Sequence, residues 1–80
     1  MPYDENKIDE AVLALLTLTL HDADEHGGRA WKGHDWDALD RLHEKGFISD
    51  PKSKAKSVVV TPEGIKAAEA AAQRLFGKDA

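Results

Sequence analysis

The sequence predicts an α+β domain of three helices and a two-stranded antiparallel hairpin, in the order α-α-β-β-α. The first observation is in residues 46–65, where a glycine is followed by two short apolar runs with lysines between them and then by Thr-Pro-Glu-Gly, a helix start. The second is helical spacing of apolar residues over 4–20 and 36–45. Eighty residues, 41% of them hydrophobic, fit one domain over residues 1–80 with a thin core.

The first helix is expected to begin at Asp4, whose carboxylate can cap free backbone N–H groups. Leu13, Leu18 and Leu20 fall outside its main apolar stripe, so this helix is apolar around most of its circumference. Such a helix is either central in its domain or shared with a second copy. Residues 16–20 also alternate with period two, which fits a short strand, but we favour the helix.

Residues 21–33 are predicted to form a loop. The pair Gly27-Gly28 interrupts any helix, and Gly33 marks the exit from this segment. Trp31 is the exception in this polar stretch, and we expect it to fold back over an edge of the core.

The second helix is predicted from about Trp36 to Lys45, with Asp35 as its N-cap. Gly46 is placed where a left-handed C-terminal cap is expected. The apolar face includes Trp36, Leu39 and Leu42, and the opposite face is charged. That charged face holds Asp37, Asp40, Arg41, Glu44 and Lys45.

Residues 47–49 and 57–60 are expected to pair as the two strands, joined by a turn that begins at Asp50-Pro51 and by a basic tip over 52–56. The third helix should begin with Thr61 as N-cap and Pro62 in its first position, and it should end at Gly77. Its apolar stripe consists of Ile65, Ala68, Ala72, Leu75 and Phe76.

Composition excludes several classes of function. The chain has no cysteine, which rules out disulfides and thiolate metal sites. Residues 1–10 are acidic where a secretory leader would be basic, and the uncharged run over 11–20 is too short to span a bilayer, so we expect a cytoplasmic protein without membrane contact. Because no nucleophile elbow, phosphate loop or dinucleotide fingerprint is present, we expect no enzyme activity, cofactor or small-molecule substrate.

The order of these elements resembles the back half of a winged helix-turn-helix domain. Residues 35–76 resemble the recognition helix, the wing and the following helix of bacterial regulators of the multidrug-resistance and phenolic-acid repressor types. Residues 3–16, 31–46 and 54–59 are similar to a family of small free-standing bacterial proteins that is known only as a domain of unknown function. The resemblance implies a winged-helix-like stand-alone module and supplies no activity.

This resemblance implies an interface with duplex DNA. The positive residues that could serve it lie on the second helix and on the wing. They are Arg41, Lys45, Lys52, Lys54 and Lys56. Two features oppose this interface. The second helix also carries acidic residues, and the first part of the chain is acidic overall. Residues 1–50 contain 5 Lys/Arg and 12 Asp/Glu, whereas residues 51–80 contain 6 Lys/Arg and 3 Asp/Glu.

Two alternatives remain open. One is a protein-interaction adaptor, without nucleic-acid binding, that forms a homodimer or binds another protein through Leu13, Leu18, Leu20 and Trp31. Sealing of the core by Trp31 and Trp36 is the favoured reading of the tryptophans. The other is a metal site in the acidic segment 21–26, but its histidines are five residues apart and lack any recognised ligand spacing.

Overall fold

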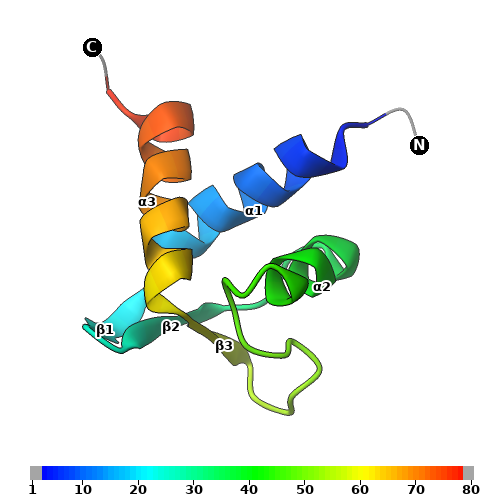
Figure 1. Cartoon of the computed structure of the whole chain (residues 1–80), viewed down its shortest axis with the longest axis vertical. Coiled ribbons are helices and arrows are strands. Elements are labelled where there is room, and N and C mark those ends of the chain that lie inside the picture. Colours follow the sequence, from blue (N-terminus) through cyan, green and yellow to red (C-terminus); the bar gives the residue numbers. More distant parts are fainter. Residues whose placement is uncertain (1–2, 79–80) are drawn as a thin grey trace.

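The computed structural model describes residues 3–78, in which three helices lie on one side of a three-stranded antiparallel sheet (Figure 1). The order is α-β-β-α-β-α, so the α+β class is confirmed and the predicted order is wrong. The elements are α1 (Glu5–Leu18), β1 (His21–Asp24), β2 (Gly27–Trp31), α2 (Trp36–Glu44), β3 (Ser57–Val60) and α3 (Pro62–Phe76).

The first helix, α1, is the central element. Asp4 is its N-cap, as predicted, and its Oδ1 accepts a hydrogen bond from the Asn6 backbone nitrogen at 2.9 Å. The helix ends at Leu18 with Thr19 as C-cap, which excludes a strand over residues 16–18. It contacts α2, α3 and β2, and this central position buries its side chains from Val12 to Ala14 and at Leu16, whereas Leu15 and Leu18 stay exposed.

The segment predicted as a loop is a β-hairpin, which corrects the interpretation of residues 21–33. Asp24 Oδ1 accepts a hydrogen bond from the His26 backbone nitrogen at 2.7 Å, and Gly27 follows with φ +120°. Gly28 lies so close to Ala23 that a side chain there would press against it. The two glycines therefore make a turn and a close strand approach, and the polar, fully exposed β1 lacks the apolar alternation that marks most strands.

The third strand, β3, pairs mainly with β2, from Gly28 opposite Val60 to Trp31 opposite Ser57. Its predicted partner at residues 47–49 contributes only one bridge, between Ile48 and Val60. Backbone hydrogen bonds from Ser49 to Val59 at 2.8 Å and from Thr61 to Phe47 at 3.0 Å flank this bridge, so the predicted antiparallel pairing is confirmed in part. The prediction missed β2, which is the main partner of β3. The hairpin formed by β1 and β2 supplies the ladder for β3, and residues 47–49 lie along its other edge.

The remaining helix boundaries follow the capping residues. Asp35 accepts a hydrogen bond from the Ala38 backbone nitrogen at 3.0 Å, and Thr61 accepts one from Gly64 at 3.0 Å. Gly46 has φ +81°, the left-handed conformation predicted for the residue that closes α2. Pro62 occupies the first position of α3, so the predicted signals at both helices are confirmed.

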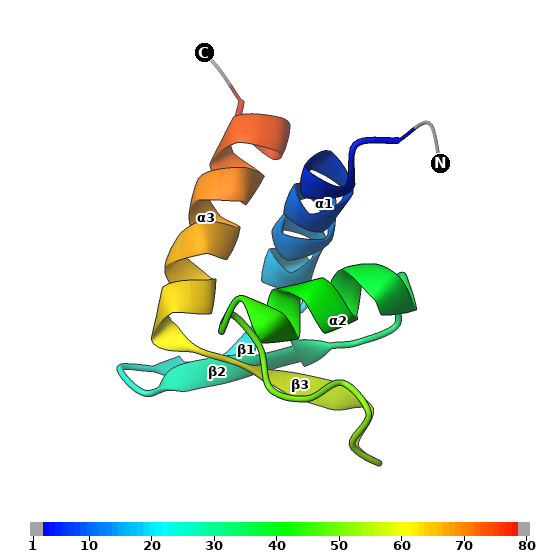
Figure 2. The same cartoon turned by 45° about the vertical axis from the view of Figure 1, so that its right-hand side comes forward.

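Figure 2 shows the helices on one side of the sheet. The buried side chains of the core lie between the helices and that face of the sheet. Val58 and Val60 of β3 point into the core, as does Ala30 of β2, while their neighbours Ser57, Val59 and Arg29 do not. This alternation means that only one face of the sheet is covered. None of the helices within residues 3–78 has the length and apolar character that crossing a bilayer requires.

Candidate nucleic-acid interface

Positive side chains gather in two different environments. Arg41 of α2 and Lys45, the C-cap residue of that helix, meet Asp9 and Glu5 of α1 in what we call the Asp9 cluster. Residues 50–56, here called the lysine loop, connect the segment after α2 to β3. They carry the three lysines Lys52, Lys54 and Lys56, all of them exposed.

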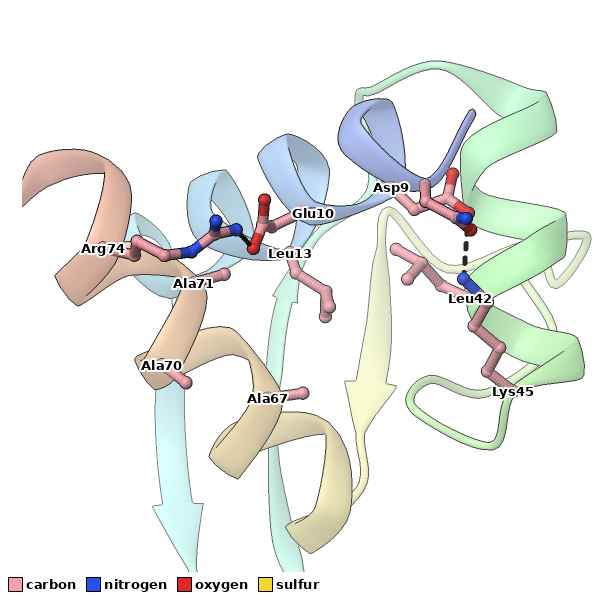
Figure 3. A pocket seen from close by; sticks show the side chains of 10 residues that line it. Asp9, Glu10, Leu13, Leu42, Lys45, Ala67, Ala70, Ala71 and Arg74 are labelled. Carbon is pink, nitrogen blue, oxygen red and sulfur yellow. Dashed lines mark hydrogen bonds and ion pairs between the residues drawn. The ribbon is translucent and has the colours of Figure 1, made fainter. Parts of the chain in front are cut away.

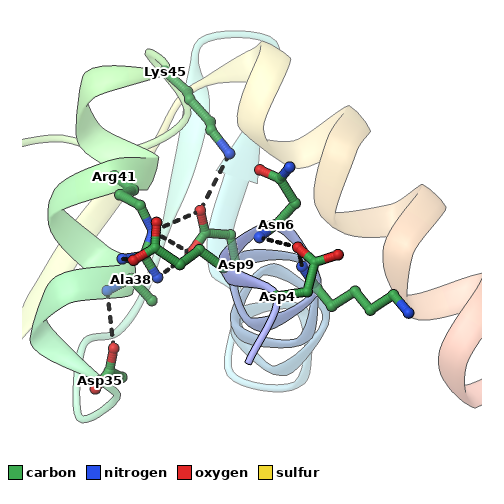
Figure 4. Close-up of polar contacts among 9 residues, drawn as sticks. Asp4, Asn6, Asp9, Asp35, Ala38, Arg41 and Lys45 are labelled. Carbon is green, nitrogen blue, oxygen red and sulfur yellow. Dashed lines mark hydrogen bonds and ion pairs between the residues drawn. The ribbon is translucent and has the colours of Figure 1, made fainter. Parts of the chain in front are cut away.

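The Asp9 cluster joins α1 to α2 through one buried carboxylate (Figure 4). Arg41 Nε donates to both Asp9 oxygens at 2.9 and 3.0 Å, and Arg41 Nη2 lies 2.8 Å from Oδ1. Lys45 Nζ donates to Oδ2 at 3.2 Å. Glu5 approaches the outer side of Arg41 at 3.5 Å. The forked guanidinium and the ammonium together satisfy a side chain that is only 3% exposed.

The electrostatics of the cluster are consistent with a structural role. Burial by itself would raise the pKa of Asp9, but the hydrogen bonds and positive charge of Arg41 and Lys45 outweigh it and hold that pKa below its ordinary value. The hydrogen bond that Arg41 donates to Asp9 raises the pKa of Arg41 in turn. Because Asp9 stays ionised, it keeps both cations of α2 directed toward α1.

The surface of α2 is therefore a poor match for phosphate. Arg41 is turned inward, with 24% of its side chain exposed, and Lys45 is engaged by the same carboxylate. Asp37 and Glu44, on the same helix, are exposed. The structure thus separates Arg41 and Lys45 from the lysine loop, with which the sequence had grouped them.

The lysine loop is held in place from inside. Lys32, just after β2, sends its ammonium group into the loop, where it donates to the backbone oxygens of Pro51 at 2.7 Å and Ser53 at 2.5 Å. Asp50 Oδ1 accepts from the Lys52 backbone nitrogen at 2.9 Å. Sequence reasoning missed Lys32, and only a pairing of β2 with β3 could have indicated its position.

The outer face of the sheet adjoins the lysine loop. Arg29 and Trp31 alternate on this face with Ala30, which is buried on the other. Arg29 Nε donates to Ser57 Oγ at 2.8 Å, and Trp31 is directly opposite Ser57 in the ladder. The backbone nitrogen of Lys32 donates to the Lys56 oxygen at 3.2 Å. An arginine, a tryptophan and the end of the lysine loop thus meet at one end of β3.

The predicted contact residues occupy different environments. Leu13 is a core residue, only 6% exposed, and Leu20 is half-buried against the core. Leu18, at 69% exposed, and Trp31, at 52%, lie on the surface. Trp36 is 57% exposed, so neither tryptophan seals the core as expected. Four further large hydrophobic residues are exposed, and two of them, Leu75 and Phe76, were predicted to lie on the apolar stripe of the third helix; the other two are Tyr3 and Leu15.

A cleft of about 440 Å³ lies between parts of α1 and α3 and extends to α2 (Figure 3). Its apolar floor includes Leu13, Leu42 and Ala71, and the ion pairs Asp9–Lys45 and Glu10–Arg74 border it. The bordering charges compensate each other, so the cleft presents no net charge to a ligand.

The acidic segment 21–26 forms β1 and its turn, with every residue exposed. Over residues 3–78 no three histidine or acidic side chains are grouped so that they could hold a metal ion. The hairpin spreads these side chains along a strand instead of converging them.

Comparison with known proteins places the chain in a family. Residues 4–78 match the family described as Domain of unknown function (DUF6429). The chain is also 55% identical over 76 residues to the "Uncharacterized protein y4hR" of Sinorhizobium fredii (strain NBRC 101917 / NGR234), a match that covers 95% of this chain and 97% of that protein. No solved structure matches the chain. The chain therefore belongs to the DUF6429 family.

Proposed function

We propose that this member of the DUF6429 family is a small non-enzymatic, nucleic-acid-associated binding module that contacts phosphate groups through its lysine loop. The observation that carries the proposal is the contrast between the two groups of cations. Lys52, Lys54 and Lys56 are exposed on one loop, and among the described residues 3–78 none of them forms an ion pair. Lysines in this state attract phosphate by charge and displace its counterions.

The position of the loop supports this function. Lys32 fixes the loop to the end of β2, so the three lysines are carried on a defined support. The order of α2, loop, β3 and α3 is that of a winged-helix domain from its recognition helix onward, which is the finer assignment that we propose for the fold. In this arrangement the loop takes the place of the wing.

The role of α2 differs from that of a recognition helix that reads bases. Its cations Arg41 and Lys45 bind Asp9, while Asp37 and Glu44 face solvent and would repel phosphate. We therefore propose that the loop provides the phosphate contacts and that α2 contributes stability. Three contacts predict weak, salt-dependent binding, because tight non-specific binders use roughly 6–10.

Fluorescence anisotropy with a labelled duplex of about 20 base pairs tests the proposal. The variant Lys52→Gln/Lys54→Gln/Lys56→Gln should bind more weakly at low salt, and the slope of log affinity against log salt should fall by about 2 to 3, at roughly 0.9 per lost contact. The matched control is Lys7→Gln/Lys66→Gln/Lys78→Gln, which removes the same charge from exposed positions on other elements.

Two outcomes would contradict the proposal. One is an equal loss of affinity in the two triple variants, which would mean that binding depends on the net charge of the protein and not on the position of the lysines. The other is absence of binding by the unaltered protein to both duplex and single strands at low salt. Circular dichroism of each variant establishes that the fold is retained.

An adaptor function is the second candidate, because exposed apolar side chains gather where α1 meets α3. Leu18 and Phe76 border a shallow depression of about 310 Å³ between these helices, and each is at least half exposed. This surface would support a homodimer or another protein partner. Light scattering should then give a dimer mass that Leu18→Asp reduces to a monomer, whereas a monomer mass at high concentration in the unaltered protein would remove this candidate.

A further inference from the structure

We propose that the uncovered face of the sheet binds single-stranded nucleic acid, with a base stacked on Trp31 and the adjoining phosphates held by Arg29 and the lysine loop. This inference rests on the phosphate-binding function proposed above. It adds that the nucleic acid is single-stranded and that one of its bases binds at Trp31.

The first step is the exposure of Trp31. Its neighbour Ala30 is fully buried beneath the helices, so alternation along β2 directs Trp31 to the opposite face. Over residues 3–78, all three helices lie on the other side of the sheet (Figure 2). An indole that is 52% exposed in a strand leaves an aromatic surface on which a base can stack.

The second step is the charge around this tryptophan. Arg29 is two residues earlier on the same face of β2, and its guanidinium is held across the sheet by Ser57 at 2.8 Å. Trp31 is also opposite Ser57, and Ser57 follows Lys56 of the lysine loop. Trp31 therefore has a positively charged side chain two residues before it on the same face, and the lysine loop begins beyond the residue opposite it.

The third step concerns the acidic strand beside β2. Asp24 is opposite Gly27, at the far end of the ladder from Trp31, and the turn beyond it adds Glu25. Asp24 and Glu25 thus place negative charge at the end of the sheet away from Trp31, while Asp22 of the same strand follows His21, the residue opposite Arg29. This distribution of charge favours a polyanion at the end that holds Trp31 and the lysine loop.

These three observations favour a single strand over a duplex. A base can stack on Trp31 only if its face is accessible, and in a duplex the faces of the bases are covered by their neighbours. Stacking on an aromatic side chain is tolerant of sequence, since every base has a π face. We therefore expect little dependence on base identity.

The test uses single strands of dT15 and rU15, each labelled with fluorescein, and a duplex of the same length, at low salt. The unaltered protein should bind the single strands more tightly than the duplex. Trp31→Ala should weaken single-strand binding by at least about fivefold, the lower limit for loss of one stacked base. Trp31→Phe should retain most of the affinity, because phenylalanine still offers an aromatic face.

Trp36 supplies the matched control. It is as exposed as Trp31 but begins α2 and lies outside the sheet. Trp36→Ala should leave affinity unchanged. Because the chain has only two tryptophans, Trp36→Phe also makes Trp31 the sole indole fluorophore, and its emission should be quenched when an unlabelled strand binds.

The outcomes separate this inference from the proposed function. If Trp31→Ala binds single strands as well as the unaltered protein does, while the triple lysine variant is impaired, phosphate contact stands and the stacking site is refuted. If neither variant changes the affinity, both proposals fall. Comparison of dT15 with rU15 shows whether the 2′-hydroxyl contributes, and in either case the loss in Trp31→Ala decides the stacking claim.

Discussion

The Asp9 cluster and the lysine loop contain the same kinds of positive side chain and use them in opposite ways. At the cluster, Arg41 and Lys45 are held by a carboxylate that is 3% exposed, and they join two helices. In the loop, Lys52, Lys54 and Lys56 remain in solvent, and the neighbouring Lys32 is the cation that holds the structure. The partner within the fold, more than the residue type, therefore determines whether a cation stabilises the protein or remains free to bind a ligand.

The largest expected effect comes from removing both cations of the cluster. Arg41→Met/Lys45→Met would leave the Asp9 carboxylate buried without a partner, and an uncompensated buried charge costs about 3–5 kcal/mol. This is a large part of the roughly 4–12 kcal/mol that a chain of this size is expected to have. Urea unfolding should show a much lower midpoint, and an unchanged midpoint would mean that the cluster contributes nothing.

Asp9→Asn should cost less, about 2 kcal/mol, the scale of a hydrogen bond to a charged group. No buried charge remains in this variant, because Arg41 and Lys45 are partly exposed and can return to water. The same urea experiment should place its midpoint between those of the unaltered protein and the double variant. A urea midpoint below that of the double variant would contradict the claim that Asp9 is the buried charge that the two cations compensate.

Acid should abolish the difference between the unaltered protein and Asp9→Asn. Because the pKa of Asp9 is lower in the folded state than its ordinary value of 3.8, its stabilising contribution is fully present above pH 3.8 and is lost as the pH falls through the folded-state pKa. The gap in unfolding free energy between the two proteins should therefore be constant from pH 7 to 5 and narrow below 3.8. A gap that widens in acid would show that the pKa is raised instead.

The smallest effect on stability is expected in the lysine loop. Lys52→Gln/Lys54→Gln/Lys56→Gln changes three exposed side chains and should alter the unfolding free energy by no more than about 0.5 kcal/mol per site. Denaturation midpoints close to that of the unaltered protein, together with weakened nucleic-acid binding, would complete the contrast with the cluster. A large loss of stability would instead assign these lysines to the fold.

Local signals in the sequence predicted much of the fold. Asp4, Asp35 and Thr61 cap their helices, and Gly46 adopts the left-handed conformation, because such positions depend on neighbours within a few residues. The hairpin of β1 and β2 was missed because β1 is exposed throughout and has no large apolar residue, and because its turn depends on a close approach at Gly27 and Gly28. The pairing of β3 with β2 joins residues far apart in the chain, and no local pattern encodes it.

The candidate interface was less predictable than the fold. The three lysines of the loop could be identified because lysines that alternate with small residues at a turn are expected to face solvent. Arg41 and Lys45 could not be separated from them, since their partner Asp9 is more than thirty positions away in the chain. Arg29 and Lys32 became relevant only when β2 brought them beside Ser57 and Pro51.

The central claim, that the sheet face and lysine loop bind nucleic acid while α2 does not, is tested most directly by NMR titration of the ¹⁵N-labelled protein with unlabelled dT15. The indole N–H signals of the two tryptophans report on the two surfaces in one spectrum. Our account predicts that the Trp31 indole and the backbone amides of residues 52–56 shift while the Trp36 indole stays in place. Shifts confined to Trp36 and α2, with Trp31 and residues 52–56 unmoved, would contradict it.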